Sequence, residues 1–176
     1  MISFAEMKLE DSYRIRDIDR SETIELIYQC NDGELQEKKV PHECPNWDEE
    51  HYKEIIRRYE YELSNGGTAY GAYDGDKLVG FGVLALKFRG KDKNQLQLDL
   101  MYVSRNYRRQ GIGSQIFYEL SQVAIEKGAT QLYISATETE SAVKFYSSRG
   151  SVVTSQVDEE LFRKEPNDIH MTKNLS

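Results

Sequence analysis

The sequence predicts an α/β fold, in which a mixed sheet carries helices on both sides. Three observations predict it. The turn residues 74–76, Asp-Gly-Asp, join two runs of strand-forming residues at 68–73 and 77–88, which is a hairpin signal. A long strand over 95–103 leads into an amphipathic helix over 111–127. Strands and short helices then alternate to the end of the chain, which favours one layered sheet.

The composition is that of one globular domain over residues 1–176. A chain of 176 residues buries roughly 70% of its unfolded surface, so its core needs no additional staple. Lys and Arg number 23 against 30 Asp and Glu, which gives a net charge of −7. Nucleic-acid binding requires a basic face, so we expect no nucleic-acid partner. An acidic chain is a better host for a cationic substrate such as an amine.

Cysteine usage and hydropathy indicate the compartment. The two cysteines, Cys30 and Cys44, are too few for a disulfide framework. The first residues contain no apolar leader, and no stretch approaches the ~18 apolar residues of a membrane span. We therefore expect a reduced, cytoplasmic protein with no membrane partner, and a homodimer stays open.

The elements of the first half are predicted from periodicity and capping. The alternation over 13–18 predicts a short strand. The run 21–29 predicts a capped helix that ends near 31–33, and residues 34–47, with two prolines, should form a loop. A second helix is expected over 48–63, after the capping residue Asp48. Its apolar stripe has four members: Ile55, Ile56, Tyr59 and Leu63.

The second half of the chain reads as strands separated by helices. We expect strands over 131–136, 152–157 and 169–173. A short helix is predicted over 141–148, and the polar segment 158–167 should be a surface loop or hairpin insert. The helix over 111–127 presents one apolar face: Ile112, Ile116, Leu120 and Val123.

The connection between the strand 95–103 and the following helix is suited to an anion. The first turn of a helix has unpaired N–H groups and a partial positive charge. Gly111 and Gly113 let a phosphate approach the backbone. Arg108 and Arg109 can add charge-assisted hydrogen bonds, and the Ser114 hydroxyl can add another. A tight strand-to-helix turn without any ligand is the alternative interpretation.

Two other phosphate motifs are excluded at this turn. A P-loop requires Gly-x-x-x-x-Gly-Lys-Ser/Thr, which the chain lacks. A Rossmann dinucleotide site requires a third glycine and an acidic residue in a βαβ unit, and neither is present.

The segment from Val103 to Ser114 resembles motif A of the GNAT superfamily of N-acetyltransferases, Arg/Gln-x-x-Gly-x-Gly/Ala. Arg108, Gly111 and Gly113 fill this motif. The segment 139–150 is similar to motif B, Asn-x-x-Ala-x-x-aromatic/Leu-Tyr-x-x-x-Gly-Phe. Four positions match: Ala142, Phe145, Tyr146 and Gly150. Two positions depart from it: Thr139 stands where Asn is common, and Ser151 where Phe is common.

The resemblance implies a GNAT-like acyltransferase with a central, mostly antiparallel sheet. It implies acetyl-CoA as co-substrate and direct attack by an amine, with no covalent enzyme intermediate and no metal. The turn would bind the pyrophosphate, and the backbone at Val103 would pair with the pantetheine arm. The expected coenzyme-binding residues are Met101, Tyr102, Val103, Arg108, Arg109, Gln110, Gly111, Ile112, Gly113, Ser114, Thr139, Ala142 and Phe145.

Asp99 is the candidate general base. An alkyl amine with a pKa of about 10.4 is almost wholly protonated at pH 7, so some group must take its proton. Period two places Gln97, Asp99, Met101 and Val103 on one face of the strand, and Leu96, Leu98, Leu100 and Tyr102 on the other. If Val103 meets the pantetheine arm, Asp99 lies beside the thioester. The alternative is that Asp99 only orients the substrate or bonds a neighbouring loop.

Tyr146 is the candidate acid, because its counterpart in the family lies near the sulfur. Proton transfer from a phenol with a pKa near 10 to a thiolate whose thiol has a pKa of about 8.5 is unfavourable by roughly 1.5 pKa units. Tyr146 could therefore stabilise the thiolate by a hydrogen bond rather than transfer a proton. A core tyrosine on a short amphipathic helix is the third interpretation.

Metal-capable, aromatic and acidic residues each allow a functional and a structural interpretation. Four metal-capable side chains have no usual zinc spacing, so no metal is expected: Cys30, His42, Cys44 and His51. Most of six aromatic residues are expected in the apolar core against which the helices pack, and an acceptor pocket is the alternative: Trp47, Tyr52, Tyr59, Tyr61, Tyr70 and Tyr73. Four acidic residues suit a solvated helix N-terminus, or the recruitment of a cationic acceptor: Glu43, Asp48, Glu49 and Glu50.

The acceptor is not determined by these patterns. A small amine, an antibiotic of the streptothricin kind, a polyamine, and a protein N-terminus or lysine all remain open. A non-catalytic acyl-CoA-binding or sensor domain is the alternative from another functional class, and the presence of Asp99 and Tyr146 argues against it.

Overall fold

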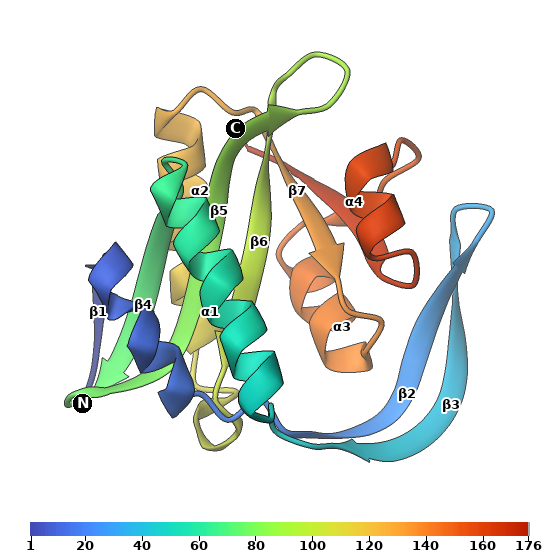
Figure 1. Cartoon of the computed structure of the whole chain (residues 1–176). Helices are drawn as coiled ribbons and strands as arrows, with labels where there is room; N and C mark the ends of the chain where they lie inside the picture. The colour runs from blue at the N-terminus through green and yellow to red at the C-terminus, as the bar shows by residue number, and fades with distance from the viewer. Residues whose placement is uncertain (176) are drawn as a thin grey trace.

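The computed structural model describes residues 1–175 (Figure 1). Its strands are β1 (Ile2–Met7), β2 (Glu22–Asn31), β3 (Glu34–Cys44), β4 (Thr68–Asp74), β5 (Lys77–Arg89), β6 (Gln95–Val103), β7 (Gln131–Ala136), β8 (Val152–Val153) and β9 (Ile169–Asn174). Its helices are α1 (Glu49–Ser64), α2 (Ile112–Glu126), α3 (Glu140–Ser148) and α4 (Glu159–Lys164), with 3-10 turns η1 (Leu9–Asp17) and η2 (Arg105–Tyr107).

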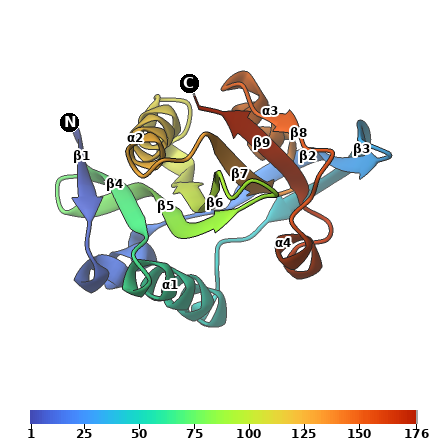
Figure 2. The same cartoon turned by 90° about the horizontal axis from the view of Figure 1, so that it is seen from above.

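The strands form one large sheet and one hairpin. The large sheet has the order β1-β4-β5-β6-β7-β9-β8, and β2 pairs only with β3. Neighbours in the large sheet are antiparallel, except that β6 and β7 are parallel. Figure 2 shows α2 and α3 on one face of this sheet and α1 and α4 on the other. The predicted α/β fold, with a mostly antiparallel sheet between helices, is confirmed.

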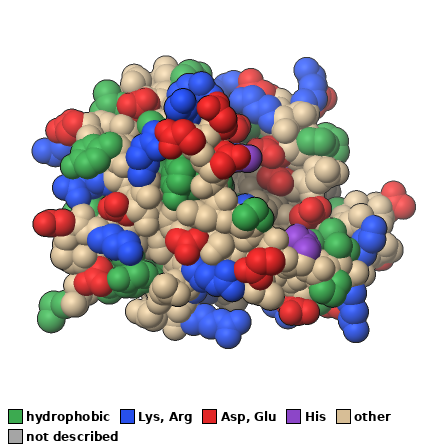
Figure 3. Space-filling model, turned by 60° about the horizontal axis from the view of Figure 1, so that its bottom comes forward, with side chains coloured by type: hydrophobic (Ala, Val, Ile, Leu, Met, Phe, Trp, Pro, Cys, Tyr) green, Lys and Arg blue, Asp and Glu red, His purple; other side chains and the backbone are tan. Residues whose placement is uncertain are grey.

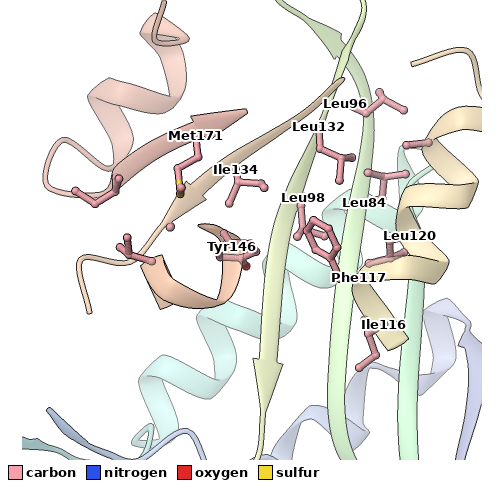
Figure 4. Close-up of a cluster of buried hydrophobic side chains, with 14 of the residues drawn as sticks. Leu84, Leu96, Leu98, Ile116, Phe117, Leu120, Leu132, Ile134, Tyr146 and Met171 are labelled. Atoms are coloured by element: carbon pink, nitrogen blue, oxygen red, sulfur yellow. The ribbon is translucent and has the colours of Figure 1, made fainter. Parts of the chain in front are cut away.

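Each face of the sheet carries its own apolar core. The larger cluster, between the sheet and α2 with α3, includes Leu84, Leu96, Leu98, Ile116, Phe117, Leu120, Leu132, Ile134, Tyr146 and Met171 (Figure 4). The second cluster lies under α1 and η1 and includes Met7, Ile15, Ile18, Ile55, Tyr59, Leu78, Phe81, Val83 and Leu100. The predicted apolar stripes of α1 and α2 both contribute to these clusters, as amphipathic helices on a sheet should.

The hairpin of β2 and β3 corrects the sequence prediction for residues 21–47. The run 21–29, predicted as a helix, is a strand, and most of the loop predicted over 34–47 is its partner. Asp32 and Gly33 both have left-handed φ angles, 52° and 81°, as a two-residue hairpin turn requires. Pro41 is accommodated because β3 bulges there, placing two residues opposite one on β2.

The structure corrects four shorter assignments. Residues 13–18, predicted as a strand, belong mostly to η1, where Ser12 and Ile15 are buried with three-residue spacing. The N-terminal strand β1 was not predicted. The strand expected over 152–157 is only the two-residue β8. The loop expected over 158–167 contains α4, which Asp158 caps by accepting from the Leu161 amide at 3.1 Å.

The strands β6 and β7 separate near the centre of the sheet. Their pairing covers only Gln95–Leu98 against Gln131–Ile134. Residues 99–103 therefore have no strand partner on that side, and β7 diverges from β6 (Figure 1). Within residues 1–175, no helix is both long and apolar enough to cross a membrane.

Candidate active site

A cleft of about 900 Å³ lies where β6 and β7 separate. Its wall is formed by the end of β6, the loop into α2, the start of α3 and the first half of β2. All but one of the residues expected at the coenzyme line it; Gln110 is exposed and lies outside the lining. Figure 3, with the bottom of Figure 1 brought forward, shows a hollow on this side of the molecule with acidic side chains around it.

The turn into α2 has the geometry of an anion site. Gly111 is the N-cap of α2 with φ 82° and ψ 4°, and no side chain caps the helix. The first N–H groups of α2 therefore face the cleft without an intrahelical partner. A Cβ added at Gly111 would meet no atom within 4 Å. Glycine is thus required by the left-handed backbone rather than by crowding within the protein. Arg109 is exposed and is also left-handed, at φ 63°.

The Arg108 guanidinium hydrogen-bonds to other groups of the protein. Its Nε donates to the Val103 carbonyl at 3.0 Å, and its Nη1 donates to the Ser21 carbonyl at 2.8 Å. Glu22 lies 3.8 Å from the same guanidinium. Burial lowers the pKa of Arg108. These bonds join the end of β6 to the start of the hairpin. Of the two arginines expected at a phosphate, Arg108 thus bonds within the protein, and Arg109 is exposed.

Gly113 lies against α3. A Cβ on Gly113 would approach Phe145 to 3.1 Å, so a larger residue would push that ring away. Phe145 also packs edge-to-face on Phe117, with centroids 6.0 Å apart. Arg149 covers its ring at 4.4 Å, which is a cation–π distance. Arg149, the C-cap residue of α3, lines the cleft and was not predicted from sequence, because only the packing of α3 brings it there.

Thr139 has the capping role that suits its position. Its Oγ1 accepts from the Ala142 amide at the start of α3, at 3.4 Å. The same residue bridges to Ile27 of β2, and the Tyr28 amide donates to the Glu138 carbonyl at 2.7 Å. The hairpin is thus attached to α3 beside the cleft. Sequence reasoning missed the contribution of β2 because it predicted a helix there, although the Asp-Gly turn signal was present.

Asp99 occupies a β-bulge in β6. Leu84 pairs with Leu98 and Val83 pairs with Leu100, so Asp99 has no partner on β5. The bulge reverses the alternation predicted for this strand. Beyond it, Leu100 and Tyr102 face α1, while Met101 and Val103 join Leu96 and Leu98 on the α2 face. The predicted faces of 95–103 are therefore wrong beyond Asp99.

Asp99 still lines the cleft, and its carboxylate is paired with α1. Arg58 Nη2 lies 2.6 Å from Asp99 Oδ1, and Gln97 Nε2 donates to the same oxygen at 3.4 Å. Oδ2 takes part in neither bond. The Asp99 side chain is 10% exposed. Sequence analysis did not identify Arg58, which is 41 residues away along the chain.

Tyr146 lines the inner part of the cleft and belongs to the larger core. Its ring packs against Phe117 at 6.0 Å and against Phe145 at 5.2 Å. Burial, and then the proximity of Tyr102, raises the pKa of the Tyr146 phenol. The hydroxyl therefore remains protonated at neutral pH and acts as a hydrogen-bond donor.

Two carboxyl groups near Arg58 have strongly raised pKa values. Burial, followed by the charge of Asp99, raises the pKa of Glu62 to about 7. Burial, followed by the charge of Glu165, raises the pKa of Asp168 to about 7. Arg58, whose Nη1 lies 4.0 Å from Glu165, opposes both shifts, and Arg89 also opposes that of Glu62. A carboxyl group cluster thus surrounds Arg58: Glu62, Asp99, Glu165 and Asp168.

The aromatic, acidic and metal-capable residues considered in the sequence lie mostly outside the cleft. None of the six aromatic residues over 47–73 lines the cleft; Trp47, for example, packs on Tyr102 with centroids 4.7 Å apart. Asp48 caps α1 by accepting from the His51 amide at 2.9 Å, as the helix N-terminus interpretation predicts. Glu43 lies instead on β3, where it pairs with Arg105 at 2.6 Å. Among the described residues, no three metal-capable side chains form a metal-binding group.

Comparison with known proteins gives one family and several relatives. The model of the acetyltransferase (GNAT) family matches residues 27–150. Thialysine N-epsilon-acetyltransferase of Bos taurus is 31% identical over 85 residues, which are 48% of this chain and 50% of that protein. The match thus spans about half the length of this curated relative.

Solved structures share the fold over the whole chain. Nourseothricin acetyltransferase superposes with a TM-score of 0.74 at 18% identity, and 99% of each chain is covered. The PaiA N-acetyltransferase of Thermoplasma acidophilum, in complex with coenzyme A, has a TM-score of 0.64 at 17% identity, again over 99% of each chain.

Proposed function

This chain belongs to the acetyltransferase (GNAT) family, and we propose that it transfers an acetyl group from acetyl-CoA to a primary amine by direct attack. One observation carries the proposal. A single cleft connects an uncapped helix start, which attracts an anion, to a carboxylate and a phenol at its inner end.

The donor half of the site is formed by the turn into α2 and by β6. The N–H groups of residues 111–114 would hold the pyrophosphate, with help from the exposed guanidinium of Arg109. Residues 99–103 have a free strand edge toward β7, so their backbone groups are available to the amides of the pantetheine arm. Phe145 and Ala142 supply an apolar wall opposite.

The transfer itself forms one bond and breaks another. The neutral amine attacks the thioester carbonyl carbon, the C–N bond forms, the C–S bond breaks, and coenzyme A leaves as a thiolate, while the nitrogen loses its surplus proton to solvent as the amide forms. Asp99 takes the proton of the incoming ammonium through Oδ2, directly or through one water. The Tyr146 hydroxyl donates a hydrogen bond to the thiolate. Burial raises the pKa of this phenol, which favours a hydrogen bond over full proton transfer.

The acceptor is proposed to be an alkyl primary amine. The curated relative is named for acetylating the ε-nitrogen of thialysine, and the same chemical class suits this site. The carboxyl groups of Glu62, Asp99, Glu165 and Asp168 surround Arg58, and Arg89, the other cation near Glu62, is paired with Asp158 and Glu160. An ammonium group would add a positive charge there and would lower the two raised pKa values. Small amines and exposed lysine or N-terminal amines of peptides both supply such a group.

An amine panel tests the proposal. The purified chain is incubated with acetyl-CoA and with alkyl amines, diamines, amino acids and short peptides, while free thiol and acetylated product are measured. We expect both to appear in equal amounts with at least one amine. Asp99→Asn should lower turnover about 100-fold or more, whereas the exposed Asp92→Asn should leave it unchanged. Acetyl-CoA binding by calorimetry without thiol release across the panel would instead support a non-catalytic binding domain.

A further inference from the structure

We propose that Arg58 is a positioning residue, which orients the Asp99 carboxylate toward the acceptor amine. This inference rests on the proposed function. Arg58 contacts Asp99 at two points. Its Nη2 donates to the carboxylate Oδ1 at 2.6 Å, and it lies 3.4 Å from the main-chain carbonyl of the same residue. Both contacts come from Nη2, so one nitrogen of the rigid, planar guanidinium touches the side chain and the main chain of Asp99, whereas the flexible stem of a lysine would place its ammonium less precisely.

The backbone at Asp99 needs an external support. The bulge removes its partner on β5, and the pairing with β7 ends at Leu98. Neither sheet neighbour therefore fixes this residue. The contact from Arg58 to the Asp99 carbonyl crosses from α1 to the strand and takes the place of a ladder hydrogen bond.

The position of Arg58 is itself fixed by the packing of α1. The next residue, Tyr59, is completely buried, and its hydroxyl donates to the Lys8 carbonyl at 2.7 Å. Ile55, one turn earlier, is also buried in the cluster beneath α1. A helix held at these points gives the Arg58 side chain a constant origin, so the guanidinium can define where Asp99 Oδ2 lies.

The positive charge of Arg58 is a second reason why its contact with Asp99 matters. A carboxylate that is 10% exposed is costly without a cation beside it. The titratable and charged groups around Asp99, Glu62 and Arg58 come from α1, β5, β6 and the segment before β9: Arg58, Glu62, Arg89, Tyr102, Glu165 and Asp168. Arg58 is the cation that contacts Asp99, whereas Arg89 is paired with Asp158 and Glu160. Removing Arg58 would take away the cation that faces this carboxylate, and the loss of an opposite charge favours the protonated form of a carboxyl group.

The test compares Arg58→Met with Arg58→Lys and with Arg57→Met, an exposed neighbour on the same helix. With an amine from the panel, we expect Arg58→Met to lower kcat about 10- to 100-fold at pH 7. The acid limb of its pH–rate profile should move up by about one unit or more, with partial recovery of activity at pH 9. The Kd for acetyl-CoA should stay within about twofold, since the turn into α2 is not altered.

Arg58→Lys should keep the acid limb in place, because the charge remains, while kcat falls about tenfold because a flexible lysine orients the carboxylate less precisely than the planar guanidinium. Arg57→Met should match the parent protein in every measurement. An acid limb that does not move in a folded Arg58→Met protein would overturn the proposal. So would a wild-type kcat in Arg58→Lys.

A second measurement separates this proposal from the proposed function. Carboxyl-carbon NMR of the isotope-labelled chain follows the titration of Asp99 directly and needs no acceptor. Asp99 should titrate at higher pH in Arg58→Met than in the parent protein, and at the parent pH in Arg57→Met. If no amine is acetylated, the proposed function fails, while the titration still decides whether Arg58 controls Asp99. An identical titration in Arg58→Met and the parent protein would overturn the inference.

Discussion

Tyr146 combines two environments in one side chain. Its ring is part of the core between the sheet and α3, at 6.0 Å from Phe117, and the residue also lines the cleft. The packing of the ring fixes where the hydroxyl lies. Removal of the hydroxyl oxygen leaves the ring contacts in place, so the function of this residue can be tested without a large change in stability.

Tyr146→Phe provides this test. We expect kcat to fall about 10- to 100-fold, because the departing thiolate loses its hydrogen-bond donor. The Kd for acetyl-CoA should change less than about threefold, since the phenol contributes mainly after the C–S bond begins to break. Stopped-flow turnover and calorimetry measure the two quantities. Tyr118→Phe, at an exposed tyrosine of α2, is the matched control. Equal losses in kcat and affinity would contradict a role in the transition state.

At the scale of elements, the connection from β6 to α2 is the part of the site that local sequence predicts best. Glycine spacing, the strand before it and the amphipathic helix after it are all local properties. The bulge at Asp99 and the hairpin of β2 and β3 are not. Both depend on which strand lies alongside, and pairing partners tens of residues away leave little trace in a short window.

Gly111→Leu tests the turn, with Gly75→Leu as its control. Both glycines have positive φ, 82° and 62°, and in both cases an added Cβ would meet open space. The backbone strain should therefore be similar, about 1–2 kcal/mol, and both variants should lose a few degrees of Tm. Only Gly111→Leu should lower acetyl-CoA affinity, by about 100-fold or more in calorimetry, because its side chain would occupy the anion site. Unchanged binding in Gly111→Leu would refute the pyrophosphate role of this turn.

At the scale of the whole molecule, the carboxyl group cluster under α1 links the site to stability. Asp168 precedes β9 and has a pKa raised to about 7, first by burial and then by Glu165. An unfolded aspartate has a pKa of about 3.9. Between these values the folded protein keeps a proton that the unfolded chain has released. Stability is therefore highest below about pH 4 for this group and is lost as pH rises toward 7.

Asp168→Asn should remove this pH dependence. At pH 8 the variant should be more stable than the parent protein by about 1 to 3 kcal/mol, and near pH 4 the two should agree. Urea unfolding across this range measures the difference. Glu159→Gln, which removes a similar charge from an exposed position on α4, should show no such trend. A difference that stays constant with pH would exclude the proposed cause.

The sequence by itself determined the class of fold, both long helices, the central hairpin and the anion-attracting turn, because each depends on periodicity or on turn residues close together in the chain. It also identified Asp99 and Tyr146 as candidates. Only the tertiary structure decided that a bulge at Asp99 reverses the alternation of the rest of β6, that Arg58 supports Asp99 across 41 residues, and that β2 borders the cleft. The physical reason is that strand pairing and buried ion pairs are set by non-local contacts, whose partners are chosen only when the whole chain packs.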